Sequence, residues 1–541
     1  MNDGGDSSGA AASLLEAVKS AAKSALFRDL DEHEGQKVII WETMCMKHVD
    51  LLIPYPEFTS HNVKHHFVLP EKPAEDLPKY PLEGVRHLFF VLPPQKRAVQ
   101  RVLECLAVKL PNRPTPHVRV LTRIPKHLEE FFAEDQRVRQ RPTSLEAWPF
   151  FWLPAFGDLV LNNFAPAQPA RLLIADDFEL FFSCAAALNE TLVARRVCWR
   201  GEWAQQVVQN LRTLKAPSTA PTCIFDQLIV VDRTLDPVSP LLEQFSFAGV
   251  LDAMFGISVK GAVEVHEGVL KQELPLHEAA EGKLEKIPLN AEIYARIVHS
   301  SIGDAVGVVR KVLRELADIE SAHGQLSSIN DFKQYMPALQ KLVKSKAAAS
   351  QAFRLCSIAF CFCAQPENRR RMECERQVLA GHFNASTPIE HVEEAIIAGG
   401  TEADGLQLLR LVVHQSLVNG GLSAKLWNEY QKLLVQSFGP PAAIWCLNLQ
   451  ISGLVQVQGG SSTRALANDH LPKATMSAAP QPPAASAERS ATTKRALFVV
   501  GGLTRAEIAC LHAQPNAFAA IFTTSILKPK DMLDFTTTTA S

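Results

Sequence analysis

A chain of 541 residues exceeds the roughly 250–300 residues that one hydrophobic core organises, so we expect several domains. Lys and Arg number 55 and Asp and Glu 57, and this net charge of −2 excludes a nucleic-acid binder that relies on a bulk positive field. The 11 cysteines show no paired spacing and we find no apolar signal region, which predicts reduced thiols in the cytosol. The longest charge-free stretch, 433–463, is broken by glycine and proline, so we expect no membrane span.

The first 150 residues carry the pattern of an α/β domain with a parallel sheet. Short apolar runs, typical of buried strands, lie at 38–41, 87–92 and 118–121. Between the second and third runs, residues 97–110 repeat apolar side chains every three or four positions, as an amphipathic helix does. Strands that alternate with helices predict domain one over residues 1–150.

A second α/β segment follows, and we assign its first part to residues 151–255. Helical patterns precede a central strand at 228–231. Asp232, Arg233 and Asp236 follow that strand at its carboxyl edge, where α/β folds often place functional residues. No nucleophile or metal ligand accompanies them, so we favour a structural role in which the arginine bridges the two carboxylates.

Helical patterns predominate from 291 to 435, and we assign residues 256–438 to domain three, a helical insertion. Apolar residues recur in a near-heptad rhythm over 302–319, and a similar pattern returns over 332–342. These two segments predict a helical hairpin whose turn lies within 323–330.

The composition changes near the C-terminal end of the sequence. Residues 455–494 are rich in Ala, Ser, Pro, Gly and Gln, which is typical of a flexible linker. A strand–turn–helix–strand pattern then covers 496–523. Because one such unit cannot bury both of its faces, we expect residues 439–541 to complete the sheet of the second α/β domain.

Two groups of residues suggest chemistry but fit structural roles better. Gly501 and Gly502 lie between a strand and a helix, where phosphates often bind, yet the G-x-G-x-x-G pattern is incomplete. His61, His65 and His66 lack the third, distant ligand that a metal site would need, so we expect them to be solvated side chains in a loop. We therefore expect no catalytic, cofactor or metal site, with a nucleotide-binding α/β enzyme built on the glycine pair as the enzyme alternative.

Four longer motifs are more specific than these short patterns. They read RGEWA at 200–204, VDRTLDPVSPLLEQFSFAGVLD at 231–252, LLRLVVHQSLVNGGL at 408–422 and GGLTRAEI at 501–508. Together they resemble the SM (Sec/Munc) family of vesicle-fusion regulators, and the last two resemble its vacuolar protein sorting-associated protein 33 branch. The structural signature residues of this resemblance are Asp232, Arg233, Asp236, Gln244, Gly249, Asp252, Gly501, Gly502 and Glu507.

The resemblance implies a fold and a function. The fold is an arch of three domains, two parallel-sheet α/β domains and a large helical insertion. The function is non-enzymatic and needs no cofactor: the protein binds SNAREs of the syntaxin-type Qa and R classes and templates their assembly for vesicle docking and fusion. It acts as a subunit of the HOPS or CORVET tethering complexes, cytoplasmic and peripheral on late endosome and vacuole or lysosome membranes, without nucleic acid.

By resemblance, the hairpin of domain three holds SNARE helices in register. Its apolar residues fit a buried core equally well, so we expect the polar neighbours Arg310, Arg314 and Asp318 to be the exposed contacts. The candidate SNARE-binding residues are Ile302, Val306, Arg310, Leu313, Arg314, Asp318, Phe332, Tyr335 and Leu339.

The same branch docks on vacuolar protein sorting-associated protein 16 through the helical region from about 427 to 449. The candidate residues of this surface are Trp427, Tyr430, Phe438, Pro440, Ala443 and Ile444. Several are smaller than the aromatic or aliphatic side chains that the family tends to offer there. The rival hypothesis within the family is a secretory or Golgi SM protein that acts alone on a syntaxin, and stable binding to protein 16 separates the two.

Overall fold

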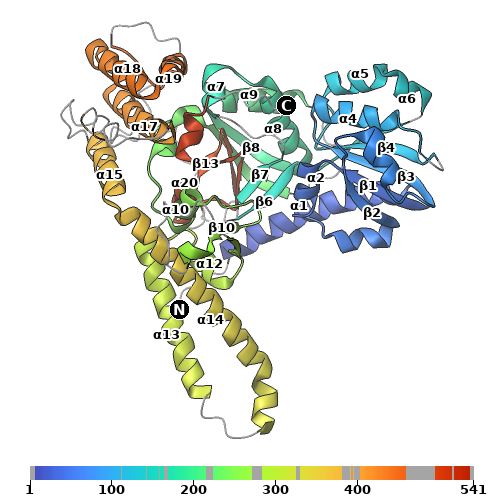
Figure 1. Ribbon diagram of the computed structural model, residues 1–541, viewed down its shortest axis with the longest axis horizontal. Coiled ribbons are helices and arrows are strands. Elements are labelled where there is room, and N and C mark those ends of the chain that lie inside the picture. The colour runs from blue at the N-terminus through green and yellow to red at the C-terminus, as the bar shows by residue number, and fades with distance from the viewer. Residues whose placement is uncertain are drawn as a thin grey trace, which may run out of the picture.

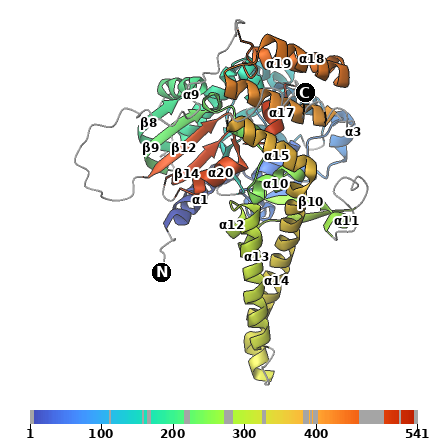
Figure 2. The same cartoon turned by 90° about the vertical axis from the view of Figure 1, so that its left-hand side faces the viewer.

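The computed structural model describes residues 6–110, 113–141, 143–156, 159–163, 169–214, 223–270, 283–323, 329–380, 390, 394, 402–458, 494–514 and 517–535. Two α/β units lie side by side, and a long helical hairpin extends away from both of them (Figure 1). A view at right angles shows the same hairpin standing clear of the body (Figure 2).

The first unit is built on a five-stranded parallel sheet with strand order β2-β1-β3-β4-β5. Its strands are β1 (Gln36–Trp41), β2 (Val63–Val68), β3 (Val85–Leu92), β4 (Thr115–Leu121) and β5 (Ser144–Trp148). The three strand predictions in this region are confirmed. His65 and His66 lie on β2 rather than in the predicted loop, because Val63 and its neighbours pair with β1.

Both faces of this sheet are covered, which explains why its strands read as continuous apolar runs. Val38 and Ile40 point to one face, where they pack with the buried side of α4 (Lys96–Leu106). Ile39 and Trp41 point to the other face, where α1 (Asp6–Asp31) contributes Leu26 and Leu30. The remaining elements of the unit are α2 (Thr43–Val49), η1 (Tyr55–His61), α3 (Pro73–Asp76), η2 (Leu77–Lys79), α5 (Lys126–Glu134) and α6 (Gln136–Gln140).

The second unit has a six-stranded sheet with strand order β6-β7-β14-β12-β9-β8, parallel except for the β6–β7 pair. Its strands are β6 (Trp152–Ala155), β7 (Leu159–Asn162), β8 (Leu192–Arg200), β9 (Cys223–Asp232), β12 (Arg495–Val500) and β14 (Ala520–Thr523). β12 lies between β9 and β14, so the C-terminal segment supplies central strands of this sheet. The expected completion of the second sheet is therefore what the structure shows.

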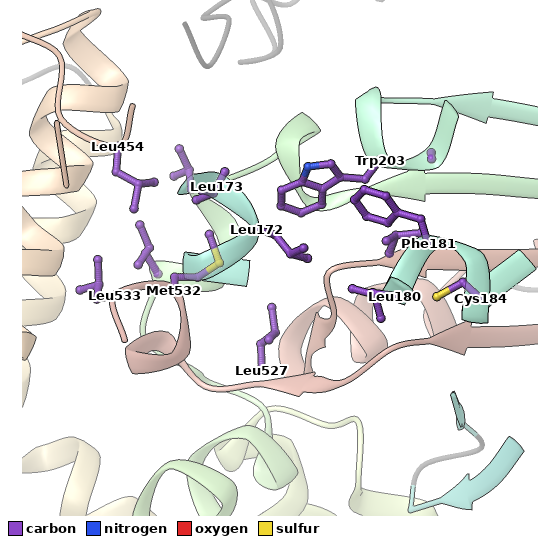
Figure 3. Close-up of a cluster of buried hydrophobic side chains, with 14 of the residues drawn as sticks. Leu172, Leu173, Leu180, Phe181, Cys184, Trp203, Leu454, Leu527, Met532 and Leu533 are labelled. Atoms are coloured by element: carbon purple, nitrogen blue, oxygen red, sulfur yellow. The ribbon is translucent and has the colours of Figure 1, made fainter. Parts of the chain in front are cut away.

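The C-terminal segment also completes the core beside that sheet (Figure 3). Leu527, Met532 and Leu533 pack into one buried cluster with Trp203 and Phe181. The helices that cover the sheet are α7 (Pro169–Ile174), α8 (Phe178–Thr191), α9 (Glu202–Thr213) and α20 (Arg505–His512). Short elements here are η3 (Arg233–Leu235), η4 (Ser239–Leu241), β13 (Leu503–Thr504), β15 (Ile526–Leu527) and η6 (Pro529–Met532).

The middle of the chain forms the projecting part of the molecule. α13 (Ile302–His323) and α14 (Ile329–Ala364) run side by side as the predicted hairpin, although its turn, 324–328, lies outside the described residues. The surrounding elements are α10 (Phe247–Met254), β10 (Ala262–His266), α11 (Glu267–Leu270), β11 (Leu284–Pro288), α12 (Glu292–Ile297) and α15 (Pro366–Leu379). β10 and β11 form an antiparallel pair that the helical pattern did not predict.

Three further helices, α17 (Glu402–Asn419), α18 (Ala424–Phe438) and α19 (Pro440–Ile451), pack onto the second α/β unit. Leu409 of α17 and Leu449 of α19 share the core that contains Phe498 of β12. The expected border at 438/439 falls between α18 and α19, which pack on each other. The predicted linker begins later than residue 455, because Val455 is buried and Val457 bridges to Leu422; residues 459–493 lie outside the described part of the chain.

One helical segment, Gln340–Ala364 of α14, is long and apolar enough to cross a membrane by length and composition. A third of its most apolar window is buried inside the protein. Ala352, Leu355 and Cys356 of this segment pack with Val309 of α13 and Ile287 of β11. Packing in the core at the base of the hairpin therefore explains the apolar character of this part of the segment.

Candidate functional site

Arg233 joins the two chain segments of the second α/β unit. Its guanidinium donates two hydrogen bonds to the Glu507 carboxylate, at 2.7 and 3.1 Å, and a third to the Gly502 carbonyl oxygen at 2.6 Å. The side chain is 3% exposed. This corrects the expected bridge between Asp232 and Asp236, because the arginine reaches across to the C-terminal segment instead.

The two aspartates beside it cap local backbone. Asp232 accepts hydrogen bonds from the amides of Ala204 and Thr234, at 2.8 and 2.9 Å, although burial raises its pKa. Asp236 accepts from the Val238 and Ser239 amides, at 3.1 and 2.9 Å, in the turn that leads into η4. Both carboxylates are committed to structural hydrogen bonds.

Gln244, Gly249 and Asp252 continue this connection around α10. The Gln244 side-chain oxygen accepts from the Ala506 amide at 2.9 Å, at the start of α20. A Cβ on Gly249 would lie 2.8 Å from the Gln244 Cβ, so only glycine fits there. Asp252 accepts from the Ile257 amide at 2.6 Å. These signature residues therefore lock α10 against the C-terminal segment.

Gly501 and Gly502 form a tight turn with φ of 97° at both residues, a conformation that favours glycine. A Cβ on Gly501 would lie 2.7 Å from the Arg233 Cβ, and one on Gly502 would lie 2.6 Å from Leu527. Protein atoms thus fill the space in which a phosphate would have to approach the backbone. The packing supports the structural interpretation of this pair.

A buried charge cluster that sequence reasoning missed connects α15 and α17 to the body. Arg410 donates to Glu243 at 2.7 Å and to Glu375 at 2.9 Å, and Arg371 pairs with Glu243 at 2.7 Å. Burial raises the pKa of Glu375 to about 7. Burial also acts on Glu243, but the Arg410 and Arg371 guanidinium groups hold its pKa below the usual value. Tertiary packing buries Glu375 and leaves Arg371 half-buried.

Of the predicted SNARE-binding residues on α13, some lie in the core and others are exposed. Ile302 is 7% exposed and belongs to the core with Val309, so it cannot contact a partner. Val306 and Leu313 are half-buried and pack against the same core. The polar candidates Arg310, Arg314 and Asp318 are exposed on α13, as are Gly303 and Gly307.

These exposed residues share one face of α13 because they are spaced by three or four positions. Apart from the backbone of α13 itself, no heavy atom of the described residues lies within 4 Å of the position a Cβ would take on Gly307. The Arg310 guanidinium lies over the Phe353 ring, 5.7 Å from its centre, and Glu320 pairs with Lys346 of α14. The result is an open, charged helix face carried on a braced hairpin.

The return helix carries the other hairpin candidates. Phe332, Tyr335 and Leu339 lie within α14 by backbone position, and their side chains lie outside the described part of the structure. Val343, one turn further along α14, is 66% exposed, and Ile319 on α13 is 44% exposed. The outer half of the hairpin therefore presents apolar side chains to solvent among its charges.

The predicted partner surface is corrected at two positions and keeps the others. Trp427 is 3% exposed and Tyr430 is fully buried, since both pack into the core beneath α18. Phe438 is half-buried against Trp445. The exposed apolar side chains of α18 and α19 include Pro440, Ala443 and Ile444, together with Val435, Leu447 and Ile451, which sequence reasoning did not select.

A large cavity of ≈ 920 Å³ lies beside the signature residues. Its walls come from the strand β12, the helix α20 and the helix α15. Phe245 and Leu379 line it and are 54% and 42% exposed. Arg233 also borders it, but this guanidinium is already paired with Glu507, so the cavity offers an apolar rather than an anionic-ligand environment.

A comparison with models of protein families shows to which family this chain belongs. A model of the Sec1 family matches residues 37–481, most of the chain. The chain belongs to the Sec1 family. This confirms the resemblance drawn from the four motifs, and the signature residues of those motifs are the ones that lock the C-terminal segment of this Sec1 family member into its second sheet.

Relatives among characterised proteins are vacuolar protein sorting-associated proteins 33A and 33B. Protein 33A of Caenorhabditis elegans is 24% identical over 485 residues, which cover 82% of this chain and 76% of that protein. Protein 33A of Rattus norvegicus is 21% identical, covering 82% and 75%. Protein 33B of Mus musculus is 23% identical, covering 82% and 70%.

Solved structures show the same fold. The Unc18–syntaxin 1 complex from Monosiga brevicollis matches with a TM-score of 0.61 at 14% identity, covering 95% of this chain and 98% of that chain. The SM protein Vps45 in complex with the Qa SNARE Tlg2 matches with a TM-score of 0.59 at 15% identity, covering 95% and 97%. The expected SM architecture, with two parallel-sheet α/β units and a large helical part, is confirmed.

Proposed function

We propose that this Sec1 family member binds SNAREs and templates the assembly of SNARE complexes, and that its role is binding rather than catalysis. The observation that carries the proposal is the exposed face of α13, with Arg310, Arg314 and Asp318, on a hairpin that projects from the body. Two structural neighbours are described as complexes with syntaxin 1 and with the Qa SNARE Tlg2, which supports this class of ligand.

The mechanism is a reduction of entropic cost. SNARE motifs are disordered alone and zip into a coiled coil through heptad layers, and ordering each residue costs about 1–2 kcal/mol before any layer packs. A rigid helix face that holds two motifs in register removes part of that cost in advance. Gly303 and Gly307 let a partner helix approach α13 closely, and the charges beyond them fix its register.

The test is charge reversal on this face. We expect Arg310→Glu with Arg314→Glu to weaken binding of labelled Qa- and R-SNARE motif peptides at least about tenfold, as lost rim charges do in steered complexes. Fluorescence anisotropy measures the affinity. Lys425→Glu, an equally exposed lysine on α18, is the matched control and should bind like the parent. Equal affinity of the double variant and the control would contradict the proposal.

We further propose membership of a HOPS- or CORVET-like tethering complex on late endosome and vacuole or lysosome membranes. Similarity to proteins 33A and 33B supports this branch. The exposed apolar side chains on α18 and α19, among them Ile444 at 61% and Leu447 at 55%, form the surface that would dock protein 16.

Co-expression with the C-terminal fragment of protein 16, followed by size-exclusion chromatography, tests this surface. We expect a one-to-one complex that Ile444→Asp with Leu447→Asp disrupts and that Lys126→Glu, an exposed change on α5 of the first α/β unit, preserves. Separate elution of two folded proteins would instead favour an SM protein that acts alone on a syntaxin, the alternative suggested by the descriptions of the structural neighbours.

A further inference from the structure

Three histidines from separate elements meet near the amino ends of β3 and β4 in the first sheet. His33 lies between α1 and β1, His87 lies on β3, and His117 lies on β4. One ring nitrogen of each comes within 4.8 Å of the others. His33 and His87 are half-buried and His117 is 4% exposed, so the cluster reaches solvent on one side only.

The separation of the ring nitrogens suits a metal ion. His87 Nδ1 and His117 Nε2 lie 3.0 Å apart. Zinc–nitrogen bonds of about 2.0–2.1 Å in a tetrahedral site place two ligand nitrogens about 3.3 Å apart. A few tenths of an ångström of side-chain movement would therefore bring the pair to ligand spacing.

The outer nitrogens already have the partners that metal-bound histidines need. His87 Nε2 lies 3.0 Å from the Glu34 carbonyl oxygen, which only accepts, so this nitrogen carries the proton and Nδ1 keeps its lone pair. His117 Nδ1 lies 2.9 Å from the Ser144 hydroxyl. The Arg119 guanidinium donates to the same hydroxyl at 2.9 Å. When the hydroxyl also accepts from His117 Nδ1, His117 Nε2 presents a lone pair, and a metal ion or a proton fits between the two nitrogens.

The same contacts allow a metal-free state. If the Ser144 hydroxyl donates to His117 Nδ1, then His117 Nε2 can donate to His87 Nδ1. For His87 and His117, the two states differ by the rotation of one hydroxyl and the displacement of one ring proton. His33, whose ring nitrogen lies within 4.8 Å of theirs, would have to move closer to reach ligand spacing.

Charges of both signs surround the cluster, namely the cations Arg119, Lys37 and Arg86 and the carboxylates Asp29 and Glu146. Arg119 follows His117 on the same face of β4, and it donates to both oxygens of Asp29 at 2.7 Å. Glu146 lies 3.6 Å from the same guanidinium. Lys37 and Arg86 add positive charge beside His87, but the Lys37 amine is held by the carbonyl oxygens of Gly35 and His61.

We propose that His33, His87 and His117 form a zinc-binding site that fastens the end of α1 to β3 and β4. Three imidazole ligands with a solvent-facing fourth position fit Zn²⁺ among the biologically common cations. Because His33 belongs to the segment that follows α1, the ion ties the N-terminal helix to the sheet that it covers. The site is separate from the hairpin and from the surface on α18 and α19.

The experiment uses the full chain after dialysis against a chelator. Added ZnCl₂ should bind one ion per chain, measured by metal analysis after gel filtration, and raise the melting temperature. His33→Ala should weaken zinc binding at least about tenfold, as the loss of a supporting group already costs 10–100-fold. His33→Cys, which restores a ligand, should recover binding and give the visible absorption of a tetrahedral site when Co²⁺ replaces zinc.

The control is His65→Ala on β2, because His61, His65 and His66 are the other histidine group nearby. This variant should bind zinc like the parent. The proposal is overturned if the parent retains no zinc, if His33→Ala retains as much as the parent, or if binding follows His65 instead. Circular dichroism of the zinc-free proteins checks that each variant folds, and His33→Cys separates a ligand role from a structural one.

Discussion

Arg233 and Glu507 lie 274 positions apart in the sequence and form two hydrogen bonds inside the second α/β unit. At the residue scale, such pairs hold together the two separate chain segments that form one sheet. Glu507 also accepts from the Thr504 amide at 2.9 Å as part of the capping box of α20. One carboxylate thus caps the first turn of a helix and pairs with a buried arginine.

Removing that carboxylate charge should destabilise the protein strongly. Glu507→Gln leaves the Arg233 guanidinium, 3% exposed, without its counter-ion, and breaking such a buried pair costs about 3–5 kcal/mol. The midpoint of urea unfolding, followed by tryptophan fluorescence, measures the loss. Glu130→Gln removes an exposed partner of Lys126 and should shift the midpoint very little. Equal midpoints for the two variants would contradict this role.

The buried His414 side chain should make the stability of the protein depend on pH. Burial and then the Arg410 charge lower the pKa of His414 to about 3 in the folded state, against about 6.5 in an unfolded chain. Below pH 6.5 the unfolded chain binds one proton more, so His414 reduces the unfolding free energy by up to about 1.4 kcal/mol per pH unit. This contribution is complete above pH 6.5 and is lost as the pH falls.

The variant His414→Gln should therefore show a shallower loss of stability between pH 7 and pH 5 than the parent. Urea midpoints at pH 7, 6 and 5 measure the slope. His127→Gln, a change on an exposed side of α5, should keep the parent slope. A parent-like slope in His414→Gln would show that other groups cause the acid sensitivity.

At the scale of elements, α13 and α14 combine two functions that one apolar pattern cannot distinguish. Near the base, Ile302, Ala305 and Val309 pack against Ala352 and neighbouring residues of α14. Beyond the base, the two helices contact mainly each other, and Ile319 and Val343 are exposed. The base is therefore a core, and the outer half is surface carried away from the body (Figure 1).

Shortening the hairpin should separate these two functions. Replacing residues 318–348 with a short Gly-Ser linker keeps Val309 and Ala349, so the body should retain its unfolding midpoint. SNARE-motif binding by anisotropy should weaken but persist, because Asp318, Ile319 and Val343 are removed while Arg310 and Arg314 remain. Binding equal to that of the full chain would show that the outer half of the hairpin is not part of the SNARE site.

At the scale of the whole molecule, the chain leaves the second sheet and returns to it. β12 pairs with β9 over six residues and with β14 on its other side, so the last segment occupies the middle of the sheet. The helices α17–α19 pack onto the same core, with Tyr430 and Leu454 among its buried residues. Middle and terminal segments therefore depend on each other for burial.

This arrangement predicts that, once the protein has folded, β12 stays in the sheet even when the chain is cut between α19 and β12. A specific protease site inserted between residues 470 and 480 should be cleavable while the two pieces still elute together, since β12 keeps both neighbours. A chain that ends at residue 494 should lack the cooperative unfolding transition of the second unit. Separation of the cleaved pieces in buffer without denaturant would contradict the prediction.

The sequence alone determined the alternation of strands and helices and the near-heptad hairpin, because both depend on local periodicity. The motif at 231–252 also indicated the family to which the protein belongs, because that motif depends on residue type. It also predicted that the last strands complete the second sheet, since a lone strand–helix–strand unit exposes apolar faces. α1 was missed because its apolar spacing is weak within an Ala- and Ser-rich stretch.

Only the tertiary structure decided which side chains face solvent and which distant groups meet. Trp427, Tyr430 and Ile302 carry the same apolar pattern as exposed Ile444, and only packing between elements separates them. Arg233 meets Glu507, and His33 meets His87 and His117, through strand order rather than spacing. The periodicity of apolar residues shows which face of a single helix or strand is apolar. Which distant side chain that face contacts depends on how several elements pack, and a short stretch of sequence does not contain this information.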